Sequence, residues 1–202
     1  MSPAACTGSA ALDALSRRLL AAAPELRVAV AGPAEREPIF RLRAEHITAA
    51  GWAELPERRE ADAHDARALQ IGAWRAGALV GAIRLVLPGA PLPVEEEFGL
   101  RIEPRGAVAE AGRLVIAADQ RGDPAHRAWG ALFARAWLSL RDHDLSVLAG
   151  AAARPMIDRL RALGLPFEIL GPAREHWGES RHPVRLDPER GAPRWYSPLD
   201  GA

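Results

Sequence analysis

Charged side chains of both signs recur at short spacing in this 202-residue sequence. Residues 60–65 (EADAHD) alone hold three carboxylates and a histidine. Several like charges pack together only where opposite charges interleave, and the planar fork of arginine suits that pairing. The spacing therefore predicts an arginine–carboxylate network, in which a carboxylate could act as a general base. The candidate members are Arg43, Glu60, Asp62, Asp65, Arg84, Glu110 and Arg113.

A solvated acidic loop is the plain alternative for residues 60–65. Three arguments weigh against it. Arg43 lies on the mixed face of a predicted helix, and Arg84 lies inside an apolar strand, where an unpaired charge is costly. Glu110 and Arg113 stand close together near the start of another strand, with only two small residues between them. We therefore expect the carboxylates and the arginines to meet.

Hydrophobic periodicity predicts the elements that must position these residues. Apolar residues at helical spacing predict helices over residues 12–22, 33–50, 123–141 and 154–163. Alternating or short apolar runs predict strands over residues 27–31, 68–74, 78–87, 109–118, 145–149, 167–170 and 183–186. Residues 75–77 fit a hairpin turn. Asp123 and Pro124 fit an N-cap followed by proline at the first helical position.

This order of elements predicts the α/β class, an α+β arrangement with a mixed sheet. The sheet is expected to be mostly antiparallel, with one helix crossing between strands in its second half. No internal repeat or long linker divides the chain, so we expect one domain over residues 1–202. Roughly 25 residues at the N-terminus and roughly 15 at the C-terminus are expected to be peripheral to it.

The composition excludes several classes of function. With 26 basic and 26 acidic residues, the chain has no net charge that would draw it to nucleic acid or to an anionic membrane. All basic residues are arginines, so no lysine can form a Schiff base. No apolar run approaches the ~20 residues that span a bilayer. The single cysteine, Cys6, cannot form an internal disulfide. We expect a cytoplasmic protein without a metal.

The charged motifs resemble the signature of the acyl-homoserine-lactone (autoinducer) synthases. Those enzymes and the related N-acyl amino acid synthases belong to the GNAT superfamily of N-acyltransferases. The resemblance covers about residues 35–187 and is most specific before residue 125. This sequence has Ile47 and Leu114 where the lactone synthases carry aromatic residues. The matching positions are Leu42-Arg43, Gly51-Trp52, Glu60-x-Asp62-x-x-Asp65, Arg84 and Glu110-x-x-Arg113.

The resemblance implies a GNAT-like fold, an acyl-thioester donor on acyl carrier protein or coenzyme A, and a small-molecule amine acceptor. The acceptor would be S-adenosylmethionine, which leads to an acyl-homoserine lactone, or an amino acid. In this fold the donor lies between two splayed parallel strands, here expected over residues 113–118 and 145–149. The backbone N–H groups of Ile116 and Ala117 would then stabilise the oxyanion. Glu110 is the expected base; the alternative is a structural partner of an arginine.

Two roles remain open for the other members of the signature. Glu60, Asp62 and Asp65 would either attract a cationic acceptor or pair with Arg43 and Arg84 to fix an N-terminal lid. Trp52 would cover the acceptor or belong to the core, and we expect a structural role for His64.

The segment before the central helix bears on the donor. Many coenzyme A-dependent GNAT enzymes carry the phosphate cradle Gln/Arg-x-x-Gly-x-Gly/Ala there, and residues 120–124 (QRGDP) fit it badly. The misfit favours acyl carrier protein, which surface arginines such as Arg121, Arg127 and Arg154 could meet. The rivals are an acetyl-coenzyme A GNAT acting on a small amine and a catalytically idle module that binds acyl thioesters. A wide apolar tunnel behind the thioester site would favour a fatty-acyl donor.

Overall fold

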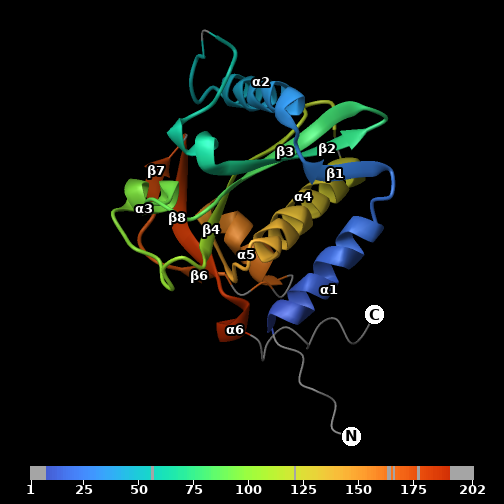
Figure 1. Ribbon diagram of the computed structural model, residues 1–202. Helices are drawn as coiled ribbons and strands as arrows, with labels where there is room; N and C mark the ends of the chain where they lie inside the picture. Colours follow the sequence, from blue (N-terminus) through green and yellow to red (C-terminus); the bar gives the residue numbers. More distant parts are fainter. Residues whose placement is uncertain are drawn as a thin grey trace, which may run out of the picture.

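The computed structural model describes residues 8–55, 57–120, 122–162, 165, 167–176 and 178–191. Its centre is one eight-stranded sheet in the order β1-β2-β3-β4-β5-β8-β6, with β7 pairing β8 at the side (Figure 1). Among the strand pairs, β4–β5 is parallel and the others are antiparallel. The strands are β1 (Leu26–Val30), β2 (Ala68–Arg75), β3 (Ala78–Val86), β4 (Val108–Ile116), β5 (Val147–Ala153), β6 (Glu168–Ile169), β7 (Arg174–His176) and β8 (Glu179–Leu186).

Helices cover both faces of this sheet (Figure 1). On one face α4 packs across β1–β4 and α1 packs on α4, which together enclose the largest core around Trp137 and Leu132. On the other face α2 packs on β2, β3 and β4 through Ile39 and Leu42. The helices are α1 (Gly8–Ala21), α2 (Pro33–Ala49), α3 (Pro93–Phe98), α4 (Asp123–Asp142), α5 (Arg154–Ala162) and α6 (Pro188–Gly191), with a 3-10 turn η1 (Ala63–Arg67).

The mixed, mostly antiparallel sheet confirms the fold class expected from the sequence. The hairpin turn at residues 75–77 is also present, with Ala76 and Gly77 both at positive φ, as a tight turn between antiparallel strands requires. Two details were wrong. The N-cap of α4 is Gly122, so Asp123 is the first helical residue. Strand β7 was not predicted, because its three residues are charged or polar and show no alternation.

The parallel strands β4 and β5 pair only over their first halves. Their register ends at Glu110 opposite Ala149, after which β5 continues to pair with β8 alone. A side chain at Gly150 would lie 2.8 Å from the Ala111 carbonyl oxygen, so glycine is needed where the strands part. The expected splay exists, but in β5 it involves residues 150–153; the predicted 145–149 segment includes the paired part.

The described chain also bears on predictions made elsewhere along the sequence. No helix in the ranges given above is long and apolar enough to cross a membrane. Cys6 lies outside the described residues.

Candidate active site

The loop that carries the acidic motif is held by its own carboxylates. Asp62 caps η1 by accepting the N–H of His64 at 2.9 Å, and Asp65 accepts the N–H of Asp62 at 2.8 Å in return. The N–H of Glu60 donates to the Phe40 carbonyl oxygen at 3.1 Å, which ties the loop to α2. The chain therefore presents three carboxylates to the sheet face that α2 covers.

Three arginines from α2, β3 and β4 interleave with these carboxylates. Arg43 Nη1 lies 3.0 Å from Asp65 and 3.6 Å from Glu60. Arg84 Nη1 lies 2.7 Å from Asp62 and 3.4 Å from Asp65. Arg113 completes the set, with Nε 2.8 Å from Glu60 and Nη2 3.2 Å from Asp62. The predicted network is therefore assembled in space from residues up to 53 positions apart.

The charge network is internally neutral and largely buried. Arg43 and Arg84 are 0% and 1% exposed, a position that charged groups tolerate only when paired. Burial opposes ionisation of Asp62 and Asp65, but hydrogen bonds and charges from Arg84 and Arg43 outweigh it, and the pKa of each carboxyl is lowered. Carboxylates held ionised in this way are poor bases, so Asp62 and Asp65 suit a structural role in the charge network.

Glu110 differs from the other acidic members. Its side chain is 6% exposed, and Oε2 accepts the N–H of Val94 at 2.7 Å. Burial raises the pKa of Glu110 to about 7, against the opposing effects of the Val94 N–H and of the charges of Arg84 and Arg113. Among the described residues those arginines form their ion pairs with Glu60, Asp62 and Asp65 and not with Glu110. A carboxyl with a pKa near 7 suits general base catalysis.

Glu110 lines a cleft of about 540 Å³ that opens where β4 and β5 part. Trp52, His46 and Arg113 line it together with Glu110, and Arg181 belongs to the same lining. The cleft also has an apolar portion formed by α4, α5 and the segment before β6. Its members are Trp129, Phe133, Met156, Leu160 and Phe167.

The two expected oxyanion donors, Ile116 and Ala117, differ in where their N–H groups point. The Ala117 N–H donates to the Val80 carbonyl oxygen at 3.0 Å, so it is already engaged in the sheet. Backbone groups alternate in direction along a strand, so the N–H of Ile116 points to the opposite side, toward the gap beside β5. The geometry thus argues against Ala117; Ile116 is not among the residues that line the cleft with Glu110, so its role as an oxyanion donor stays a prediction.

Trp52 forms part of the wall of the cleft. Its ring and that of His46 meet edge-on at a centroid distance of 5.5 Å, and the Arg181 guanidinium lies 5.3 Å from the Trp52 ring centroid. Gly178 approaches so closely that an added Cβ would lie 2.4 Å from the ring. Trp52 is thus positioned by packing and still contacts the cleft.

His64, by contrast, lies among structural contacts. Its Nε2 is 3.2 Å from Glu96 and its Nδ1 is 3.2 Å from Arg67, which in turn donates to the Leu87 carbonyl oxygen. These contacts agree with the structural role expected for it.

The segment before α4 begins the helix at Gly122 without a side-chain cap, and Arg121 lies outside the described residues.

The surface arginines expected to meet a carrier protein have partners on the chain itself. Arg127 pairs with Glu25 at 3.0 Å, and Arg154 pairs with Asp158 at 2.9 Å. Both guanidinium groups remain exposed. Across the part of the chain that the structure describes, no group of His, Cys, Asp and Glu side chains could hold a metal ion.

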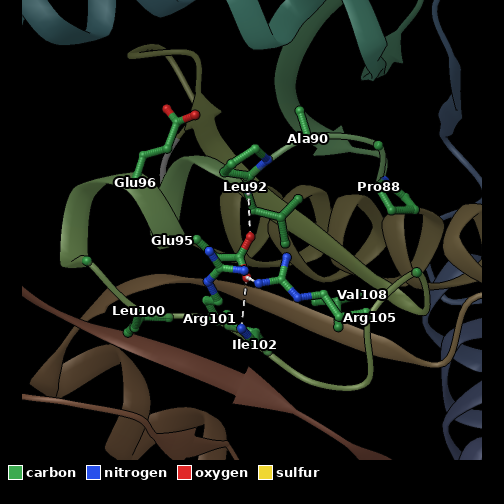
Figure 2. A pocket seen from close by; sticks show the side chains of 14 residues that line it. Pro88, Ala90, Leu92, Glu95, Glu96, Leu100, Arg101, Ile102, Arg105 and Val108 are labelled. Carbon is green, nitrogen blue, oxygen red and sulfur yellow. Dashed lines mark hydrogen bonds and ion pairs between the residues drawn. The ribbon is translucent and has the colours of Figure 1, made fainter.

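A second, larger cavity of about 780 Å³ is formed by the loop between β3 and β4 (Figure 2). Glu95 lies at its wall, where Oε2 accepts the Leu92 N–H at 2.9 Å and Oε1 accepts the Ile102 N–H at 2.8 Å, as the dashed lines in Figure 2 show. Arg105 lies 3.9 Å from the same carboxylate. Because both oxygens of Glu95 hold the loop together, we assign it no chemistry.

The sequence did not reveal four polar residues that line the cleft. His176, Glu179 and Arg181 come from the β7–β8 hairpin, and His46 lies one turn beyond Arg43 on α2. Only the helical spacing of Arg43 and His46 could have placed one of them near the network.

Comparison with solved structures identifies the architecture. The chain matches the AHL synthase LasI with a TM-score of 0.70 and 18% identity, over 85% of this chain and 94% of LasI. The chain has the fold of the acyl-homoserine lactone synthases. The resemblance expected from the charged motifs is thereby confirmed at the level of the fold. No protein-family model and no curated protein matches the sequence.

Two further structures share this synthase fold. BjaI, a CoA-dependent acyl-homoserine lactone synthase solved with SAM and isopentyl-CoA, matches with a TM-score of 0.68 and 20% identity, over 82% of this chain and 84% of BjaI. FeeM, an N-acyl amino acid synthase from uncultured soil microbes, matches with a TM-score of 0.60 and 18% identity, over 85% of this chain and 96% of FeeM.

Proposed function

We propose that the chain is an N-acyltransferase that moves a fatty-acyl group from a thioester to the amine of a small acceptor. The observation that carries this proposal is Glu110, a buried carboxyl with a pKa of about 7 at the point where β4 and β5 separate. Its neighbours Arg84 and Arg113 are committed to the scaffold carboxylates. Glu110 is therefore the member of the signature best suited to accept a proton near neutral pH.

The reaction needs one proton acceptor and one oxyanion site. In the proposed step the Glu110 carboxylate takes a proton from the acceptor's ammonium, and the free amine nitrogen attacks the thioester carbonyl carbon. A backbone N–H of the part of β4 that lines the cleft, residues 111–114, would donate to the carbonyl oxygen as it becomes negative. When the C–O double bond re-forms, the C–S bond breaks; the thiolate leaves and takes the second proton that the attacking nitrogen must lose. The products are an amide and a thiol, and Glu110 releases its proton to solvent.

The apolar part of the cleft supports a fatty-acyl donor over acetyl-coenzyme A. Phe133, Met156, Leu160 and Phe167 line it, and the whole cleft measures about 540 Å³. An alkyl chain removed from water there gains roughly 0.8 kcal/mol for each buried CH₂ group. An acetyl group would leave this apolar lining unfilled.

We propose the carrier and the acceptor by analogy with the similar solved structures. BjaI was solved with SAM and isopentyl-CoA, and FeeM is described as an N-acyl amino acid synthase. For this chain we propose S-adenosylmethionine or an amino acid as the acceptor. Residues 120–124 fit the phosphate cradle badly, which favours a donor carried on acyl carrier protein. Cytoplasmic location stays a prediction.

The test uses the purified full-length protein with two sets of substrates. The donors are butanoyl, decanoyl and tetradecanoyl thioesters, each on acyl carrier protein and on coenzyme A, with acetyl-coenzyme A as the comparison. The acceptors are S-adenosylmethionine and the protein amino acids, and mass spectrometry detects the amide. We expect product from a long-chain donor; turnover of acetyl-coenzyme A alone would overturn the proposal in favour of the rival. Binding without turnover of any donor would indicate the idle module.

A further inference from the structure

A cavity of about 420 Å³ lies between the N-terminal helix α1 and the helices α4 and α5. On one side α1 lines it with Leu12, Leu15 and Leu19, and α4 and α5 contribute Phe133 and Met156. Figure 1 shows α1 packed alongside α4 at this place. The charged motifs of the synthase resemblance begin only at about residue 35, so no function for α1 follows from them.

This cavity adjoins the cleft that Glu110 lines. Trp129, Phe133 and Met156 line both spaces, so side chains separate the two. The rings of Trp129 and Phe133 stack with their centroids 5.9 Å apart, and methionine is unbranched and adapts its shape readily. An acyl chain that fills the apolar part of the cleft can therefore continue past these side chains toward α1.

Two polar atoms in the lining lack a partner. Ser16 Oγ on α1 and Trp129 Nε1 on α4 are buried and have no hydrogen-bond partner within the described part of the chain. Ser16 is 1% exposed. A buried donor without an acceptor is costly, and such groups in a native structure point to a missing partner. An oxygen atom on a ligand in the cavity would supply it.

We propose that this cavity binds the distal part of the donor's acyl chain, the part away from the thioester, and selects chains that carry an oxygen there. Ser16 and Trp129 form the hydrogen bonds to that oxygen, and the leucines of α1 form the end wall. This inference rests on the proposed function and narrows its donor to a long acyl chain with a distal hydroxyl or carbonyl group.

The remaining polar members of the lining indicate that this oxygen is neutral. His126 and Arg159 are exposed, so the buried part of the cavity carries neither of them. Among the described residues no carboxylate lines the cavity. A hydroxyl or carbonyl oxygen is satisfied by neutral donors, whereas a carboxylate in the buried part would lack a counter-charge.

Helix α1 is held firmly enough to act as a wall. The Trp137 Nε1–H donates to Asp13 at 2.7 Å, and the N–H of Ser9 donates to Glu189 on α6 at 3.1 Å. At Gly130 on α4 an added Cβ would lie 3.7 Å from Leu19, an ordinary contact distance. The two helices thus meet closely at one edge of the cavity and limit its length.

The first experiment tests recognition of the oxygen. Tetradecanoyl thioesters, unsubstituted or with one hydroxyl at successive carbons of the distal half, are assayed on the carrier and with the acceptor that support turnover. We expect wild type to prefer at least one hydroxylated chain about tenfold in kcat/KM. Ser16→Ala should reduce this preference below about threefold, because only the Trp129 N–H remains. Wild type without a preference for any hydroxylated chain would overturn the inference.

Ser139→Ala is the matched control for this variant. Ser139 is also a buried serine whose Oγ lacks a partner, but it lines neither the cavity nor the cleft. We expect it to keep the wild-type preference. Equal loss of the preference in Ser16→Ala and Ser139→Ala would assign the effect to stability and contradict the inference.

The second experiment fills the cavity. Ser16→Leu places a larger apolar side chain in it, and we expect kcat/KM for tetradecanoyl donors to fall about 10- to 100-fold, with butanoyl donors within about twofold of wild type. Ala14→Leu, at an exposed position of the same helix, is the control and should change neither value. Thermal melting verifies folding. If Ser16→Leu does not fold, Gly130→Ala replaces it and should act more weakly in the same direction. Equal effects on short and long donors overturn the inference.

A binding measurement separates this inference from the proposed function. Tetradecanoyl-coenzyme A and its hydroxylated counterparts are titrated calorimetrically into wild type, Ser16→Ala and Ser139→Ala without an acceptor. We expect wild type and Ser139→Ala to bind one hydroxylated chain more tightly, and Ser16→Ala to lose most of that difference. If no amide forms with any pair, the proposed function fails, and this titration alone decides the cavity: equal binding of all chains by wild type overturns the inference.

Discussion

Two buried glutamates in this molecule differ in what surrounds their carboxylates. Glu95 on α3 and Glu110 on β4 are 7% and 6% exposed, and both accept N–H groups from residues 92–102. Glu95 uses both oxygens to close the loop between β3 and β4. Glu110 receives the Val94 N–H on Oε2 and lies at the wall of the cleft.

The difference shows how the surroundings distinguish a carboxylate that holds a loop from one that we propose as a base. Burial disfavours the charge of a carboxylate, whereas N–H donors restore it. At Glu110 burial prevails, and its pKa rises to about 7. At Glu95 the two N–H groups make the carboxylate part of the fold. Four measurements would break or sharpen this contrast.

The largest effect is expected on catalysis. Glu110→Gln keeps the shape of the side chain and an oxygen to accept the Val94 N–H, but it cannot accept a proton. We expect kcat to fall by about 10²- to 10⁴-fold. Steady-state kinetics of amide formation measure this, and Glu95→Gln, assayed as folded protein, serves as the comparison. A Glu110→Gln enzyme with full activity would leave the base to another group.

The next effect is on stability, and its sign is opposite to that of most core substitutions. The unfolded Glu110 ionises near its ordinary pKa of 4.5 and the folded one at about 7. Between these values the unfolded state holds fewer protons, so the stability of the wild type falls as pH rises. Glu110→Gln removes this cost and should raise the free energy of unfolding by about 3 kcal/mol above pH 7, with little of that gain below about pH 4. Urea unfolding at both pH values tests it.

Glu95→Ala should have the reverse pattern. It leaves the N–H groups of Leu92 and Ile102 without their acceptor and should lower the free energy of unfolding by about 2 kcal/mol. Activity per folded molecule should stay close to wild type. Glu103→Ala, at an exposed glutamate of the same loop, is the control and should change stability by less than about 0.5 kcal/mol. Equal losses in the two variants would contradict the structural role of Glu95.

The smallest effect is the pH profile of the wild type. If Glu110 acts as the base, kcat/KM should fall about tenfold for each pH unit below 7, since only the ionised carboxylate accepts a proton. The profile of Glu110→Gln should lack this limb, while Glu95→Gln should retain it. A limb that persists in Glu110→Gln belongs to a different group.

Much of the fold and the charge network could be predicted from the sequence. Arg84 stands in an apolar strand, so its charge requires a partner, and residues 60–65 offer three carboxylates. The periodicity of α2 and the alternation of β4 then place Arg43 and Arg113 on elements that face the same loop. These inferences use only local sequence patterns and the free-energy cost of burying an unpaired charge.

The rest depends on distances that no local pattern contains. Arg181 reaches the cleft only because β7 and β8 form a hairpin of polar residues beside β5. The raised pKa of Glu110 depends on which carboxylates Arg84 and Arg113 pair with, and differences of about 1 Å in distance decide that pairing. The sequence showed seven acidic and basic candidates alike, and only the folded structure separates the ion-paired scaffold from Glu110, whose pKa is raised.

The closed set of three arginines and three carboxylates has a consequence for how the protein can evolve. Removing any one member leaves a buried charge without its counterpart, which typically costs about 3–5 kcal/mol. Such losses approach the whole free energy of unfolding of a domain, so we expect single substitutions at these positions to prevent stable folding. Change there would require coordinated exchanges that preserve neutrality at each step. The six positions are therefore expected to be inherited as one unit, while the apolar lining of the cleft remains free to vary.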